Sequence, residues 1–171
     1  MFELLSVAQS EVWRAQRLAP DDPAYSVGGY VEIQGEVDRE RLERAIRQVL
    51  EQADSCHYLF RDTDEGPRQI LSVQDRIELP LVDFTDAANP RAQALAWMRE
   101  ATETAFDLTL GPLYRNALLK IAADRWIWVG VFHHLVTDFF GAILMLRSVA
   151  EQYTCGAHTA VSDAPRFTPW S

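Results

Sequence analysis

The sequence has little of what several protein classes require. Its two cysteines, Cys56 and Cys155, lie far apart and in no Cys-x-x-Cys pattern, which leaves a disulfide framework or a structural zinc site without support. No apolar run reaches the roughly 18 residues of a membrane-spanning helix, and Met1–Leu5 lacks the basic-then-apolar pattern of a signal peptide. Sixteen basic against 25 acidic residues give a net charge of −9, which disfavours nucleic acid and anionic lipid. We therefore expect a cytoplasmic protein with neither nucleic-acid nor membrane contacts.

What the sequence does contain predicts one α/β domain. Its 171 residues are 48% hydrophobic, enough for one sizeable core. Ser6 and Gln9 form a capping-box pattern, Asp38 precedes an apolar stripe of helical spacing, and Asn89-Pro90 resembles a helix start. Apolar periodicity predicts helices at about 6–18, 38–53, 89–105 and 138–156, and strands at 25–34, 57–61, 68–72, 79–82, 113–121 and 125–134. Residues 157–171 are predicted to form a polar exit segment outside the core.

Two of the four histidines, His133 and His134, are adjacent at the end of a predicted strand. Neighbouring side chains of a strand point to opposite faces, so the two imidazoles should have different surroundings. Both parities of this strand are apolar, which predicts a central strand covered on both faces. We expect one histidine to point inward and be held by hydrogen bonds, and the other to reach a cleft. An imidazole suits proton transfer there because its ordinary pKa of about 6.5 leaves it neutral at cellular pH.

Asp138 follows His134 by four residues, close to a predicted helix start. It could orient the histidine, bind a cation or cap the helix. Three other interpretations stay open. Both histidines could be structural, with Asp138 only a cap. His133, His134 and Asp138 could bind a metal, although divergent strand neighbours are poor co-ligands. A hydrolase is disfavoured because no Gly-x-Ser-x-Gly elbow occurs.

The segment from His133 to Asp138 resembles the His-His-x-x-x-Asp-Gly signature of the condensation domains of nonribosomal peptide synthetases. Two further segments are similar to family motifs in the same order: 6–13, which resembles the opening Ser-x-Ala-Gln helix, and 106–115, which resembles Phe-Asp-Leu…Gly-Pro-Leu-x-Arg. The segment Phe167-Thr168-Pro169-Trp170 is similar to the exit segment of siderophore synthetases of the enterobactin type. The resemblance covers essentially the whole chain.

This resemblance implies a chloramphenicol-acetyltransferase-like fold, a two-layer α/β sandwich whose mixed sheet carries flanking helices. Residues 1–171 would form the N-terminal lobe of a normally two-lobed, V-shaped domain. The reaction would join a carrier-bound acyl or peptidyl thioester to the amine of a carrier-bound amino acid. No cofactor would bind directly, because carrier proteins present the substrates on phosphopantetheine arms. The other partners would be the C-terminal lobe, whose absence should expose an apolar face and cause self-association, and an adjacent adenylation domain.

The resemblance also implies residue roles. His134 would be catalytic and would position or deprotonate the amine, whereas His133 and Asp138 would be structural. His57 stands where the family has an arginine that pairs with the aspartate, so a pH-dependent pair is expected. Phe139 replaces the signature glycine, at a cost of about 1 kcal/mol or more if that position needs positive φ. Phe139 and Gly141 are candidates to line the substrate channel.

Phe139 and His57 favour a rival interpretation, in which a degenerate domain docks a carrier protein or tailoring enzyme without forming a bond. A stand-alone acyltransferase that uses coenzyme A is a second rival. The sequence leaves the donor and the acceptor unidentified.

Overall fold

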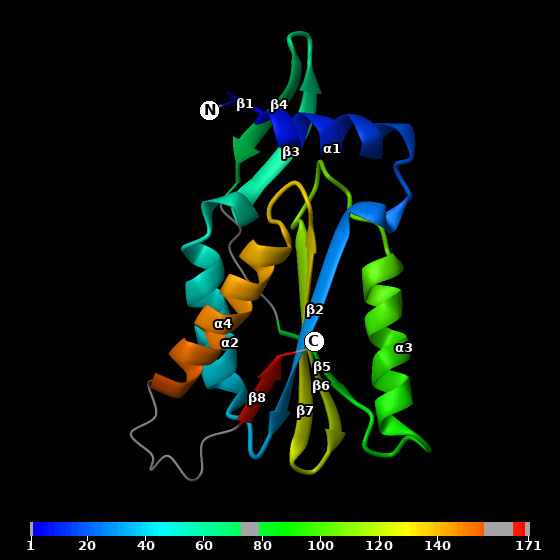
Figure 1. The fold of residues 1–171 in the computed structure, drawn as a ribbon, viewed down its shortest axis with the longest axis vertical. Helices are drawn as coiled ribbons and strands as arrows, with labels where there is room; N and C mark the ends of the chain where they lie inside the picture. Colours follow the sequence, from blue (N-terminus) through cyan, green and yellow to red (C-terminus); the bar gives the residue numbers. More distant parts are fainter. Residues whose placement is uncertain (1, 73–78, 156–165, 170–171) are drawn as a thin grey trace.

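The computed structural model describes residues 2–72, 79–155 and 166–169, which form a mixed main sheet, a small second sheet and flanking helices (Figure 1). The main sheet has the order β5 (Leu81–Asp83), β6 (Tyr114–Ala122), β7 (Arg125–His133), β2 (Ser26–Gln34) and β8 (Arg166–Pro169). The small antiparallel sheet has the order β1 (Phe2–Leu4), β4 (Gly66–Leu71) and β3 (Tyr58–Thr63). The helices are α1 (Val7–Leu18), α2 (Arg39–Glu51), α3 (Pro90–Glu103) and α4 (Phe139–Cys155), with short 3₁₀ helices at Pro23–Tyr25 and Asp54–His57. This arrangement confirms the predicted α/β class.

Strand β7 is the middle strand of the main sheet, between β6 and β2, and is antiparallel to both. One row of its side chains, including Trp128 and Phe132, belongs to the core under α2 and α4. The other row, including Ile127 and Val131, belongs to the core under α3. Helices therefore cover both faces, and α3 adds a layer to the predicted two-layer sandwich (Figure 1).

Local signals explain where the helices begin. The Asp38 side chain accepts a hydrogen bond from the Arg41 N–H, and the Asn89 side chain accepts one from the Ala92 N–H. Each bond satisfies a backbone donor that has no partner within the helix. Leu42 lies on the buried stripe of α2. The predicted starts of these helices are confirmed because capping depends on residues only three positions apart.

Helix α1 lies across the end of the main sheet at which β7 finishes and β2 begins (Figure 1). Its predicted capping box is present, since the Gln9 N–H donates to Ser6 Oγ and the Ser6 N–H donates to Gln9 Oε1. Trp13 anchors the helix, with its ring centroid 6.1 Å from that of Phe60 in β3. The helix thereby joins the small sheet to the end of the main sheet.

The C-terminal segment differs from the prediction. Residues 166–169 of the expected exit segment pair with β2 as strand β8, with Ile33 opposite Phe167, so they extend the main sheet. Residues 157–165 and 170–171 of that segment lie outside the described residues. The polar sequence hid a strand that is stabilised by backbone hydrogen bonds to a neighbouring edge. Within the described part of the chain, no helix has both the length and the apolar character needed to cross a bilayer.

Candidate functional site

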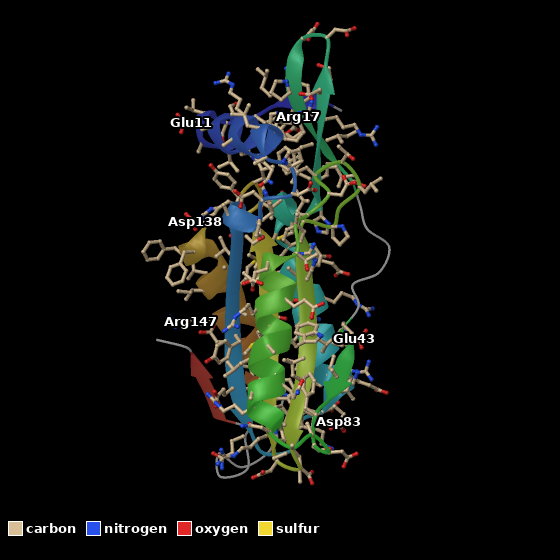
Figure 2. The ribbon with its side chains drawn as sticks, turned by 90° about the vertical axis from the view of Figure 1, so that its right-hand side faces the viewer. Glu11, Arg17, Glu43, Asp83, Asp138 and Arg147 are labelled. Atoms are coloured by element: carbon tan, nitrogen blue, oxygen red, sulfur yellow. The ribbon has the colours of Figure 1, made fainter. Side chains whose placement is uncertain are left out.

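The two histidines lie where β7 turns toward α4. His133 is the last residue of the strand, and His134 begins a turn that leads to Asp138. Figure 2 shows Asp138 at the end of α4 nearest α1, the helix that carries Glu11 and Arg17. The predicted division holds, because His133 is buried whereas His134 is exposed.

The hydrogen bonds of His133 fix its tautomer. Its side chain is 2% exposed. Nδ1 accepts the backbone N–H of Leu135 at 3.1 Å, so this nitrogen carries no proton. Nε2 lies 3.2 Å from the side-chain oxygen of Gln16, to which it donates its proton. The ring packs near Tyr25 and lies edge-on to Phe106, with centroids 6.4 and 6.0 Å away.

Burial lowers the pKa of His133 from its ordinary 6.5 to about 4, and the neighbouring His134 contributes in the same direction. Removing the ring from water disfavours the charged form, and both nitrogens are already committed as one donor and one acceptor. His133 is therefore neutral at cellular pH and places no positive charge beside His134.

His134 is held through its backbone, since its N–H donates to the Tyr25 carbonyl at 2.8 Å. Tyr25 ends the short 3₁₀ helix before β2, and the paired strands β2 and β7 fix this contact. The flanking N–H groups of His133 and Leu135 donate to the Leu113 carbonyl and to His133 Nδ1, so the backbone is anchored on both sides of the exposed imidazole. Such an arrangement suits a group that contacts another molecule at the surface.

Asp138 caps α4. Its Oδ1 accepts the Gly141 N–H at 2.7 Å, and its carbonyl accepts the Ala142 N–H at 2.9 Å. The expected pair between Asp138 and His57 is wrong for this structure: His57 Nε2 lies 3.0 Å from the Leu50 carbonyl, and no ion pair joins it to Asp138 within the described ranges. The 3₁₀ turn at Asp54–His57 directs the ring back toward the end of α2.

Phe139 carries no backbone strain. It is the first residue of α4, and no described residue other than glycine has positive φ, so the condition for the expected cost is not met. Its side chain is 54% exposed, and those of Phe140 and Leu144 are also exposed. Gly141 is needed for another reason, since a Cβ there would overlap the Thr137 hydroxyl. The start of α4 therefore presents an apolar surface beside the histidine turn.

Arg115 supports the site from behind, a role that sequence reasoning did not predict. Its guanidinium lies 3.7 Å from the ring centroid of Phe106 and donates to the carbonyls of Ala101, Thr104 and Ala105. Phe106 is the ring that lies edge-on to His133. The segment 106–115 thus builds the wall against which the buried histidine packs. Only the resemblance of this segment to a family motif signalled it.

Gln16 is a second residue that sequence reasoning missed, because its partner lies 117 residues away.

Within the residues that the structure describes, no group of three His, Cys, Asp or Glu side chains is arranged to hold a metal ion. Both nitrogens of His133 already have protein partners, so His133, His134 and Asp138 do not form a ligand set.

The fold and the site define a class of protein: an α/β domain whose central strand ends in paired histidines. The chain belongs to the Condensation domain family, which matches residues 2–171. Condensation domains are amide-forming acyltransferases of nonribosomal peptide synthetases. The resemblance drawn from the motifs is thereby confirmed.

Similar proteins include solved structures and curated synthetases. The starter condensation domain of rhizomide synthetase is 38% identical with a TM-score of 0.86, covering 95% of this chain and 40% of that chain. The dimodular nonribosomal peptide synthase of Bacillus subtilis (strain 168) is 35% identical over 88% of this chain and 6% of that protein. Enterobactin synthase component F of Escherichia coli (strain K12) is 31% identical over 98% of this chain and 13% of that protein. The chain thus spans a small part of these synthases.

Proposed function

We propose that this chain is the N-terminal lobe of a condensation domain that forms amide bonds on carrier-bound substrates. The observation that carries the proposal is the exposed His134 at the end of a buried central strand, beside a histidine held neutral by two hydrogen bonds. Its partners would be carrier proteins with phosphopantetheine arms, a second lobe and an adenylation domain. The relatives named above, which are multidomain synthases, support this set.

The chemistry needs only a neutral imidazole at this place. The amine nitrogen of the acceptor attacks the thioester carbonyl carbon, the carbon–sulfur bond breaks, and the carrier thiol leaves. His134 accepts the proton that the amine loses and returns it to the departing sulfur. Product and thiol account for all atoms. His133 and Asp138 keep the turn in place and touch no reacting atom.

We infer an acyl rather than a peptidyl donor. A mutant of the starter condensation domain of rhizomide synthetase was solved with C8-CoA, and another relative, from Streptomyces coeruleorubidus, is an isonitrile lipopeptide synthase. An apolar chain also suits the exposed start of α4. Phe139 is our candidate to line the substrate channel, with Gly141 supporting the turn. Phe140, Ile143 and Leu144, which are exposed here, would contact the second lobe.

The test is turnover by the whole condensation domain with loaded donor and acceptor carrier proteins, followed by mass spectrometry of the product. We expect His134→Ala to reduce kcat by at least about 100-fold, in the range of a lost general base. Arg99→Met, which changes an exposed residue of α3, serves as the control. Unchanged turnover in His134→Ala would refute the assigned role.

A docking module is the second candidate, and one observation favours it: in the described residues Asp138 has no ion pair with a cationic side chain. In that case the wild-type domain would bind loaded carriers and release no product. A separate turnover reaction supplies acyl-CoA in place of the loaded donor carrier protein. Turnover in that reaction alone would indicate a coenzyme A-dependent acyltransferase.

A further inference from the structure

The Gln16 side chain is oriented by three backbone carbonyls. It is 5% exposed, and its nitrogen donates to the carbonyls of Ala19, Pro20 and Asp22 at 2.9, 3.1 and 2.9 Å. An amide nitrogen only donates and an amide oxygen only accepts. The three carbonyls therefore fix which end of the amide faces them, and the oxygen must face the opposite way.

That oxygen points at His133. The Gln16 Oε1 lies 3.2 Å from Nε2, and because it only accepts, the ring nitrogen must carry the proton. The Leu135 N–H selects the same tautomer from the other side of the ring, because it donates to Nδ1. Two contacts from separate parts of the chain thus select one neutral tautomer.

The side-chain nitrogen of Gln16 is connected to the backbone of His134 through the segment 19–25. The three carbonyls that it binds belong to the segment 19–22, which runs directly into the 3₁₀ helix Pro23–Tyr25. The carbonyl of Tyr25 accepts the His134 N–H at 2.8 Å. A single amide thus contacts His133 directly and holds the segment that receives the backbone of His134.

We propose that Gln16 is a positioning residue of the condensation site, which sets the proton position of His133 and the backbone position of His134. The proposal rests on the proposed function for its catalytic meaning. Gln16 itself is buried and would touch no substrate. Its effect is transmitted through the buried ring and through the segment 19–25.

Two variants separate the two ends of the amide. Gln16→Glu keeps an oxygen toward His133 but removes the donors to the three carbonyls, and its carboxylate favours a protonated ring. Gln16→Met has a similar volume and removes both functions. Trp13→Phe is the matched control, since it changes a residue of the same helix and removes the hydrogen bond from Trp13 Nε1 to Asp62 in β3, whereas the two hydrogen bonds of the His133 ring are left in place.

The first measurement is the ring ¹⁵N spectrum of His133 at pH 7 in the 171-residue chain. We expect a neutral ring protonated on Nε2 in the wild type and in Trp13→Phe, and a partly protonated ring in Gln16→Glu. A wild-type proton on Nδ1, or an unchanged ring in Gln16→Glu, would overturn the proposal.

The second measurement is hydrogen exchange of the His134 amide. Exchange should be about fivefold to tenfold faster in Gln16→Met than in Trp13→Phe, which corresponds to the net loss of about one hydrogen bond. Equal exchange in the two variants would show that Gln16 acts only through the stability of α1. In the whole domain, Gln16→Met should lower kcat with little change in KM. Because both spectroscopic results need no turnover, an inactive wild-type domain would refute the proposed function and leave these results standing.

Discussion

The turn between the histidines and α4 depends on a contact that only glycine permits. Gly141 is the third residue of α4, and a Cβ built on it would overlap Thr137 Oγ1 and lie 3.3 Å from Asp138 Oδ1. Its distance to Thr137 Cβ would be an ordinary 3.7 Å. The hydroxyl of Thr137 is therefore the atom that makes alanine unacceptable here. Removing that hydroxyl should remove the conflict.

The size of the effect follows from two opposed contributions. Forcing a methyl group into a packed site costs roughly 1–3 kcal/mol, and threonine is too stiff at χ1 to move away freely. Alanine in place of glycine returns up to about 1 kcal/mol of helix propensity. We therefore expect Gly141→Ala to destabilise the fold by about 1–2 kcal/mol. In a Thr137→Ala background, the same substitution should be neutral or stabilising.

The assay is a double-mutant cycle in which urea unfolding is monitored by tryptophan fluorescence. The coupling between the two positions should be about 1–3 kcal/mol. Gly29→Ala is the control, since its Cβ would meet only the terminal methyl of Leu146, at 3.3 Å, and that methyl can move. Additivity of the two substitutions within about 0.5 kcal/mol would refute the reasoning.

Three further predictions concern the surroundings of the site. Because the pKa of His133 falls from 6.5 to about 4 on folding, its contribution to stability is complete above pH 6.5 and is lost as the pH falls toward 4. The difference in unfolding free energy between wild type and His133→Phe should therefore change by up to about 3 kcal/mol across this window, and a flat difference would contradict the assignment. Arg115→Met should destabilise by about 1–3 kcal/mol in urea unfolding because three carbonyls lose their donor, whereas the exposed control Arg99→Met should stay within about 0.5 kcal/mol. Asp138→Ala should cost about 1 kcal/mol in thermal unfolding, and Asp138→Asn should retain most of the cap; equal losses would show that the charge matters more than the hydrogen bond.

The sequence by itself determined the features that depend on neighbours a few residues apart. The caps at Ser6, Asp38 and Asn89 were predicted because each needs only a backbone N–H two or three positions ahead. The opposite surroundings of His133 and His134 were predicted because a strand alternates its side chains whatever it packs against. The catalytic role of His134 stays a prediction.

Only the tertiary structure decided which distant groups meet. Gln16 reaches His133 across 117 residues of sequence, and no local pattern distinguishes it from an ordinary helical glutamine. His57 bonds to Leu50 because a 3₁₀ turn redirects its ring, a change that sequence alignment to a motif does not report. The strand Arg166–Pro169 forms because β2 offers it an open edge. In each case the partner is set by how the chain crosses itself, whereas caps and alternation are set by the covalent geometry of adjacent residues.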